Sequence, residues 1–132
     1  MKPKYKKVSK LTKKGYEFIE GKLGHKYWYL NGERHREDGP AIERPDGTKD
    51  WYLNGEGEKH REDGPAIEYP DGSKFWYLNG ELHRTDGPAS EWWNGDKEWY
   101  LNGKEITLKT RSKNPKVKKL QDLMKAQELL ES

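Results

Sequence analysis

The stretch that decides the fold runs His60-Arg-Glu-Asp-Gly-Pro-Ala-Ile-Glu-Tyr-Pro-Asp-Gly-Ser-Lys-Phe-Trp-Tyr-Leu-Asn-Gly80. Its parts recur along the chain. The string Trp-Tyr-Leu-Asn-Gly begins at Trp28, Trp51, Trp76 and Trp99, with spacings of 23, 25 and 23 residues. The string His-Arg-x-Asp-Gly-Pro-Ala begins at His35, His60 and His83. Self-similarity at a fixed period indicates a repeat array, and the unit here is 23 residues long.

Turn signals inside the unit predict consecutive β-hairpins. Pro-Asp-Gly and Asn-Gly supply the positive φ angles that tight hairpin turns need. If Asp46-Gly47 is a two-residue turn, Ile42 pairs with Trp51, and the same register pairs Ile67 with Trp76 and Ser90 with Trp99. We therefore expect a mainly β fold, a single antiparallel sheet of hairpins. Its repeated tryptophans then form a structural ladder on one face.

The opposite face is the predicted binding surface. The period of two places the tyrosines and two acidic residues there, and we expect a partner protein to contact Tyr29, Tyr52, Tyr77, Tyr100, Glu43 and Asp50. Tyrosine combines a large contact area with a polar tip at a low cost in entropy. An exposed tyrosine ladder bordered by carboxylates predicts a protein-binding face.

Three segments are expected: a basic N-terminal tail over residues 1–14, the repeat array over 15–107, and a basic linker with a helix over 108–132. Asn114 can cap a helix that has Pro115 at its first position. Apolar residues recur at helical spacing: Val117, Leu120, Leu123, Met124, Leu129 and Leu130. We expect an amphipathic helix over 115–130 that packs on its own sheet, with dimerisation or partner binding as the alternatives.

Charge and composition restrict the function. Only 30% of residues are hydrophobic, so the six tryptophans and eight tyrosines must supply most of the packing. The formal net charge is +3, but residues 15–103 carry 11 basic and 19 acidic residues, whereas residues 1–14 carry seven lysines and no acid. Because phosphate contacts dominate nucleic-acid affinity, we expect nucleic acid to bind only through the basic tails, if at all. A short lysine run is most often a solvated tail.

Histidine and aspartate recur together, as His35, His60 and His83 with Asp38, Asp63 and Asp86. A catalytic site needs one tuned constellation, whereas the same pair recurs in every unit, which is typical of a structural turn. We expect each aspartate to accept hydrogen bonds from backbone amides of its own turn, and each arginine after a histidine to pair with Glu43, Glu68 or Glu91. The sequence has no nucleophile elbow, Walker loop or Gly-x-Gly-x-x-Gly, so we expect no enzymatic activity, metal or cofactor.

The period, with Asp71-Gly72-Ser73-Lys74-Phe75, Asn79-Gly80 and His83, resembles MORN repeats. MORN repeats form ribbons of consecutive β-hairpins and serve as scaffolds, and the resemblance implies both for the array. The unit with His-Arg-x-Asp-Gly-Pro-Ala and Trp-Tyr-Leu-Asn-Gly also resembles repeats in proteins of tailed bacteriophages and some large viruses. This likeness implies a phage-encoded accessory factor that acts on a host protein.

The leading hypothesis is a non-enzymatic module that binds or inhibits a host protein with a basic surface. Two alternatives stay open: a scaffold held on nucleic acid or a membrane by the basic tails, and a protein that sequesters a small ligand or nucleotide. A homodimer through the C-terminal helix also stays open. No apolar run reaches the roughly 18 residues of a membrane span, and no signal peptide is recognisable. With no cysteines, the chain fits the cytoplasm, the host's if it is viral.

Overall fold

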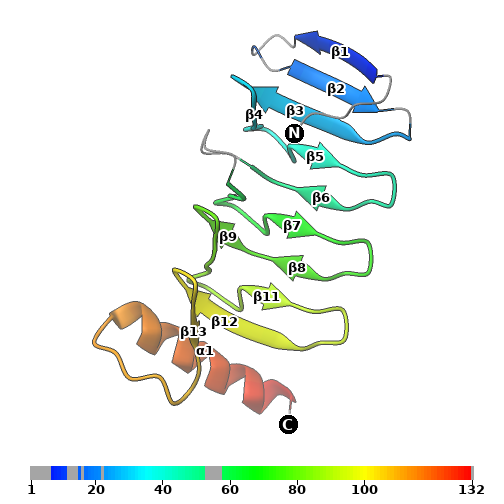
Figure 1. Ribbon diagram of the computed structural model, residues 1–132. Helices are drawn as coiled ribbons and strands as arrows, with labels where there is room; N and C mark the ends of the chain where they lie inside the picture. The colour runs from blue at the N-terminus through cyan, green and yellow to red at the C-terminus, as the bar shows by residue number, and fades with distance from the viewer. Residues whose placement is uncertain (1–6, 12–14, 16, 22, 53–57, 132) are drawn as a thin grey trace.

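The computed structural model describes residues 7–11, 15, 17–21, 23–52 and 58–131. Within them the chain forms one large, open antiparallel sheet of hairpins, followed by a single C-terminal helix (Figure 1). The predicted fold class is therefore confirmed. No helix in these residues is long and apolar enough to cross a membrane.

The strands are short and mostly pair with their neighbours in sequence. They are β1 (Lys7–Leu11), β2 (Glu17–Gly21), β3 (Lys26–Leu30), β4 (Glu33–Arg34), β5 (Ile42–Glu43), β6 (Lys49–Asp50), β7 (Ile67–Glu68), β8 (Lys74–Phe75), β9 (Tyr77–Leu78), β10 (Glu81–Leu82), β11 (Ser90–Glu91), β12 (Lys97–Leu101) and β13 (Lys104–Ile106). The sheet order is β1-β2-β3-β5-β6-β7-β8-β11-β12-β13, with β4 on β3 and a separate β9–β10 pair. The helix is α1 (Pro115–Glu131).

The array extends further toward the N-terminus than the sequence suggested. Residues 7–11 belong to the segment predicted as a basic tail, yet they form β1 and pair with β2. Residues 1–6 and 12–14 of that segment lie outside the described residues. One edge of the sheet is therefore a strand that contains Lys7 and Lys10.

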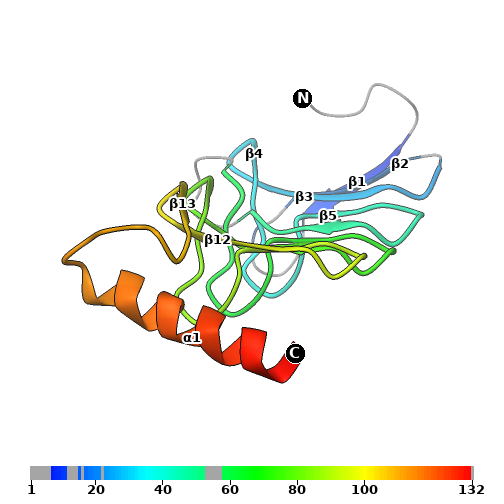
Figure 2. The ribbon, with the colours of Figure 1, turned by 90° about the horizontal axis from the view of Figure 1, so that it is seen from below.

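Each unit has two hairpin arms that meet near the repeated tryptophan. The Pro-Asp-Gly arms lie side by side and form the large sheet, and the Asn-Gly arms form a second row beside them (Figure 1). Seen from below, the labelled strands β4 and β13 rise on the side of the sheet away from α1 (Figure 2). The Asn-Gly arms and α1 therefore lie on opposite sides of the sheet (Figure 2).

The Asn-Gly arms close with tight turns, as predicted, and each turn has two residues. Leu78 pairs with Glu81, and the two residues between them have positive φ angles, 52° at Asn79 and 80° at Gly80. Two successive residues with φ > 0 define the type I′ turn, whose twist matches that of paired strands. Asparagine and glycine adopt this conformation at low cost.

The Pro-Asp-Gly arms close differently from the prediction. The Tyr69 amide donates to the Ser73 carbonyl (3.0 Å) and the Gly72 amide to the Tyr69 carbonyl (3.1 Å), so the loop has three residues rather than two. Gly72 has a φ of 97°, and no described aspartate has a positive φ. Proline favours the first central position of a type I turn, and a glycine with positive φ then completes the three-residue loop.

The extra loop residue shifts the register by one, so the predicted pairs are wrong. Ile42 pairs with Asp50 instead of Trp51, Ile67 with Phe75 instead of Trp76, and Ser90 with Glu98 instead of Trp99. A shift of one residue moves every side chain to the other face. The tyrosine of each unit therefore shares a face with Ile42 and Ile67, and the tryptophan lies on the opposite face.

Alternating charges run across the tryptophan face. Paired positions on successive strands carry, in order, Lys26, Glu43, Lys49, Glu68, Lys74, Glu91 and Lys97. Opposite charges on directly paired residues stabilise a sheet, whereas like charges destabilise it. The alternation therefore favours the observed register.

Helix α1 covers the C-terminal end of the array. Val117, Leu120 and Met124 pack against Trp99, Leu101 and Ile106 in one buried cluster. The Asn114 side-chain oxygen accepts a hydrogen bond from the Lys116 amide (2.9 Å), as an N-cap does. The helix thus packs on its own sheet, whereas Leu129 and Leu130, predicted within its apolar stripe, are exposed.

Candidate interaction surface at the C-terminal end of the array

Each internal unit stacks an arginine on its tryptophan. The guanidinium carbons of Arg36, Arg61 and Arg84 lie 3.9, 4.0 and 3.9 Å from the ring centroids of Trp28, Trp51 and Trp76. In the second unit, Arg61 Nη1 also donates to Glu68 (3.2 Å) and to the Pro65 carbonyl (3.1 Å). The predicted pairs of arginine with Glu43, Glu68 and Glu91 are confirmed.

The recurrent aspartates and histidines have structural partners. Arg61 Nε donates to Asp63 (2.9 Å), which lowers the pKa of Asp63, and Asp38 and Asp86 accept equivalent bonds. The Asn79 amide donates to His60 Nδ1 and the Asn102 amide to His83 Nδ1, both at 2.9 Å. Each of these histidines therefore links its own unit to the next Asn-Gly turn. The corresponding residue for His35, Asn54, lies outside the described residues.

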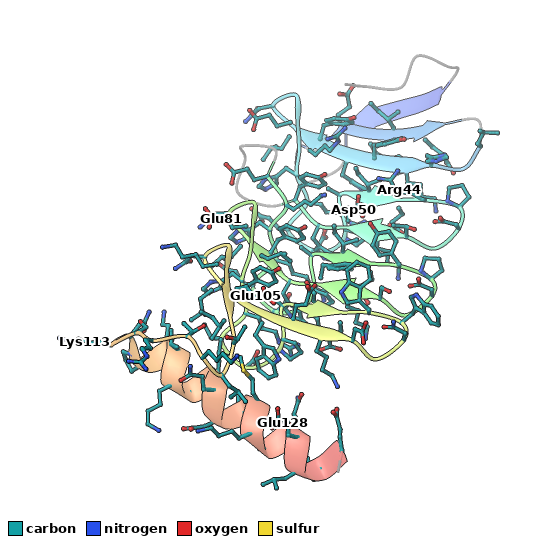
Figure 3. All side chains as sticks on the ribbon, turned by 60° about the horizontal axis from the view of Figure 1, so that its bottom comes forward. Arg44, Asp50, Glu81, Glu105, Lys113 and Glu128 are labelled. Carbon is teal, nitrogen blue, oxygen red and sulfur yellow. The ribbon has the colours of Figure 1, made fainter. Side chains whose placement is uncertain are left out.

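The tyrosine surface predicted from sequence is not exposed as expected. Tyr29 is 3% exposed, Tyr52 is 7% exposed, and Tyr77 and Tyr100 are half-buried. Asp50 is 5% exposed and accepts a bond from Arg44 (3.0 Å), which lies beside it in Figure 3. Glu43 is half-buried against Arg36. The cause is the register shift, which turns the tyrosines toward the isoleucines.

The repeated tryptophans share one face, as predicted, but most of them are not fully buried. Trp28, Trp51 and Trp76 are half-buried beneath their arginines, and only Trp99, beneath α1, is buried. Burial, the largest cause, raises the pKa of Tyr52 and Tyr77 above that of an exposed tyrosine. The tyrosine side of the sheet therefore contributes more to the core than sequence reasoning assigned to it.

An exposed group of aromatic side chains, which sequence reasoning missed, lies on the last two Pro-Asp-Gly arms. We call Tyr69, Phe75, Trp92 and Trp93 the aromatic cluster. Phe75 contacts Tyr69 and Trp92 edge-on, with ring centroids 5.8 and 5.0 Å apart. Tyr69 and Trp92 are each 43% exposed and Trp93 is 68% exposed. The sequence feature that could have indicated this cluster is Trp92-Trp93, which stands where the preceding unit has Tyr69-Pro70.

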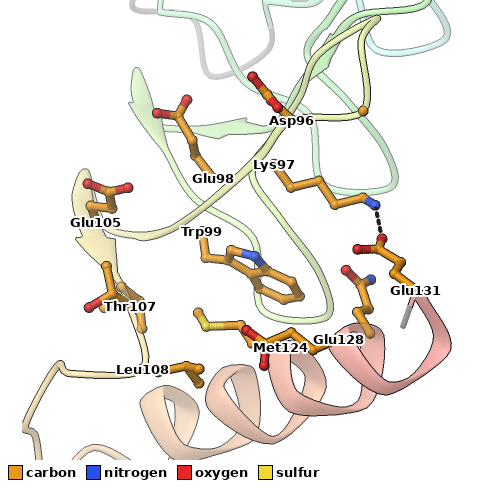
Figure 4. Close-up of a pocket in the computed structure, with 13 residues that line it drawn as sticks. Asp96, Lys97, Glu98, Trp99, Glu105, Thr107, Leu108, Met124, Glu128 and Glu131 are labelled. Carbon is orange, nitrogen blue, oxygen red and sulfur yellow. Dashed lines mark hydrogen bonds and ion pairs between the residues drawn. The ribbon is translucent and has the colours of Figure 1, made fainter.

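A hollow of about 390 Å³ lies between β12, β13 and α1, and we call it the end hollow (Figure 4). Trp99, Ile106, Leu108 and Met124 form its apolar lining. Figure 4 shows Met124 and Glu128 on the helix side of Trp99, whereas the carboxylates of Glu98 and Glu105 point away from Trp99. The space is therefore bounded by both the last hairpin and the helix.

Carboxylates outnumber cations around the end hollow. Its acidic lining residues are Asp96, Glu98, Glu105, Glu128 and Glu131, against the single cation Lys97. Lys97 pairs with Glu131 at 3.1 Å. In the part of the chain that the structure describes, the other four carboxylates have no ion pair. The rim of the end hollow is therefore acidic, but Glu98 and Glu105 lie on the Tyr100 face of the hairpin, opposite Trp99 and Ile106.

Two further hollows, of about 530 and 600 Å³, lie between successive His-Arg-x-Asp-Gly-Pro loops. Trp51 lines one and Trp76 the other, and each indole already carries the arginine of its own unit. Among the described residues, no group of three or more His, Asp or Glu side chains could hold a metal ion.

Comparison of the chain with protein-family models, with curated proteins and with solved structures finds no match. The aromatic cluster and the end hollow meet at Glu98, which lines the hollow and accepts a hydrogen bond from Trp92 Nε1 (3.1 Å). Together they make the C-terminal end of the array the candidate interaction surface.

Proposed function

We propose that this chain is a non-enzymatic protein-interaction module that binds a basic protein surface through the aromatic cluster. The exposure of Trp92 and Trp93 carries the proposal. Tryptophan and tyrosine are enriched among the residues that dominate binding energy, because they bury a large area with few rotatable bonds. Exposed contiguous apolar patches typically mark interaction sites.

Acidic residues around the cluster support a basic partner. Asp71 lines the aromatic cluster, Asp96 follows it in the last Pro-Asp-Gly-type loop, and Glu98 holds Trp92. Complementary charge steers the encounter between partners and fixes their orientation. The sequence resemblance to phage repeats agrees with a host protein as the partner, and inhibition of that protein is then the proposed effect.

The test is Trp93→Ala. Since Trp93 is exposed, we expect its removal to leave the melting temperature within about 2–4 °C of wild type while it weakens partner binding by at least about 2 kcal/mol. Affinity capture from host lysate identifies the partner, and calorimetry with the purified partner measures the loss. The matched control is Leu23→Ala, which removes an exposed apolar side chain at the far end of the array. Equal affinity for Trp93→Ala and wild type would contradict the proposal.

A further inference from the structure

Large side chains form a row across the Pro-Asp-Gly arms, which lie side by side in Figure 1. Arg44, Tyr69 and Trp92 each come directly before a three-residue loop, and their amides donate across it to a carbonyl at 3.0, 3.0 and 2.9 Å. All three residues are exposed, whereas Thr48 and Ser73, which lie between them in the row, are buried. The row is therefore an alternation of exposed ridges and buried floors.

Two hollows lie between these ridges, one on each side of Tyr69. The first, which we call the aromatic hollow, has a volume of about 290 Å³ and lies over Ser73, with the four rings of the aromatic cluster and Asp71 around it. The second, which we call the acidic hollow, has a volume of about 350 Å³ and lies over Thr48. Its charged lining residues are Arg44, Asp46, Asp50 and Asp71. Tyr69 and Asp71 line both hollows, so the two are neighbours.

The acidic hollow has carboxylates in excess of its one cation. Arg44 pairs with Asp50 at 3.0 Å. Asp46 and Asp71 each use one oxygen to accept an amide hydrogen bond inside their own loops, at 2.9 and 2.8 Å, and within the described residues neither has an ion pair. Arginine suits this hollow, because its planar guanidinium stacks on an aromatic ring such as Tyr69 and donates to more than one carboxylate.

The spacing of the two hollows selects the backbone conformation of an occupant. Thr48 and Ser73 lie two strands apart, which corresponds to about 9.5 Å across the sheet. A polyproline II helix has three residues per turn and rises about 3.1 Å per residue, so residues i and i+3 lie on one side about 9.3 Å apart. Aromatic-lined grooves bind such segments, since their conformation is formed before binding. A segment that crosses the strands therefore places residues i and i+3 in the two hollows.

We propose that the two hollows bind a polyproline II segment of the partner protein, with a proline in the aromatic hollow and an arginine three residues away in the acidic hollow. The inference rests on the proposed function, because it names the kind of segment that the aromatic cluster recognises. Proline brings an apolar ring and no backbone N–H that would need a partner. The arginine supplies the positive charge that complements Asp46 and Asp71.

The test uses the full chain and blocked heptapeptides, with NMR detection of the indole N–H signals of Trp92 and Trp93. The probe Pro-Pro-Pro-Arg-Pro-Pro-Pro has a proline three residues from the arginine in both directions, and we expect it to shift both signals. Ala-Pro-Pro-Arg-Pro-Pro-Ala lacks these two prolines, so its affinity should fall about tenfold, because the contact in the aromatic hollow is lost. Pro-Ala-Pro-Arg-Pro-Ala-Pro has the same composition but keeps them, and it should bind as the probe does.

The charges are tested by combining Asp46→Asn with Asp71→Asn. Asparagine keeps an oxygen that can accept the amide hydrogen bond of each loop, but it removes the charge, so affinity for the probe should fall about tenfold. A probe with citrulline, the neutral isostere of arginine, should bind wild type and this variant equally. The matched control, Glu81→Gln with Asp122→Asn, removes two charges outside both hollows and should leave probe affinity unchanged.

Equal affinity of the two alanine-containing peptides would overturn the inference, and so would the absence of any indole shift at millimolar probe. The purified partner separates this inference from the proposed function. If the partner loses affinity for Trp93→Ala but not for the aspartate variant, the aromatic cluster remains the binding site and the polyproline segment is wrong. If the peptides bind as expected but Trp93→Ala leaves partner affinity unchanged, the proposed function is wrong.

Discussion

At the scale of single residues, the stability of the array depends on a repeated contact between arginine, tryptophan and glutamate. Arg61 contacts the Trp51 ring and donates to Glu68 and Asp63. A cation–π contact contributes about 0.5–2 kcal/mol, and the hydrogen bond to the partly buried Glu68 about 1.5–3 kcal/mol, whereas the bond to Asp63, whose side chain is 87% exposed, contributes little. Such contacts compensate for the low hydrophobic content, because the chain repeats them in each internal unit.

The glycine after each aspartate makes room for this arginine. A Cβ atom at Gly64 would lie 2.8 Å from Arg61 Cζ, and Gly39 and Gly87 have the same relation to Arg36 and Arg84. We expect Gly64→Ala to destabilise the protein by about 1–2 kcal/mol, because the flexible end of Arg61 can move away from the new Cβ only by giving up its contact with Trp51 and its hydrogen bond to Glu68. Urea denaturation measures the loss. In an Arg61→Ala background the cost should shrink, because the clash is gone, and an undiminished cost would contradict this explanation.

At the scale of elements, a histidine links successive Asn-Gly hairpins. His83 Nδ1 accepts from the Asn102 amide, so the contact joins the loop after β10 to the turn between β12 and β13. Only an imidazole unprotonated at Nδ1 can accept this bond. Burial, followed by the positive charge of Lys116, lowers the pKa of His83 below its ordinary 6.5, although Glu81 opposes the shift.

The sign of this shift predicts how stability depends on pH. The folded-state pKa lies below the unfolded one, so the unfolded state takes up the proton first. The hydrogen bond to His83 therefore contributes its full free energy of stabilisation above the pKa of His83 in the unfolded chain. This contribution is lost as the pH falls through the lower pKa of His83 in the folded protein. Melting temperatures between pH 7 and pH 5 should fall less for His83→Asn, which keeps an acceptor that does not titrate. If the melting temperatures of wild type and His83→Asn fell equally between pH 7 and pH 5, His83 would not be the group responsible.

At the scale of the whole molecule, α1 takes the place of a further unit at the end of the array. The helix buries Trp99, whereas in the internal units an arginine covers the tryptophan. Glu131 of the helix pairs with Lys97, as Glu91 of the neighbouring strand pairs with Lys74 in an internal unit. Terminal repeats need such a cap, since their outer face would otherwise meet water. The helix thus closes one end, and the other end is the lysine-containing edge strand β1.

Since each unit contacts mainly its neighbours, damage to the cap should spread only gradually. Leu120 is fully buried, so Leu120→Ala should cost about 2–5 kcal/mol locally. Hydrogen exchange should show the largest loss of protection in β12 and β13 and the smallest in β2 and β3. The control Leu130→Ala, in the same helix at an 85% exposed position, should change little. A uniform loss across all strands would show that the array unfolds as one unit.

The sequence by itself determined the elements whose signals are local. The Asn79-Gly80 turn follows from the low cost of positive φ at these residues, and α1 follows from Asn114-Pro115 and the helical spacing of Val117, Leu120 and Met124. The repeated period determined that hairpins follow one another. The arginine–glutamate pairs followed from opposite charges at recurrent positions.

Only the tertiary structure decided which face each aromatic occupies. The loops after Arg44 and Tyr69 could each have two residues, but in the structure they have three. This difference of one residue shifts the strand register and exchanges the faces on which tyrosine and tryptophan lie. Burial of Tyr52, exposure of Trp92 and Trp93, and the end hollow all depend on that register and on where α1 packs. The register itself follows from the three-residue loop, but the exposure of Trp92 and Trp93 and the end hollow arise from contacts between residues distant in sequence, so no local propensity encodes them.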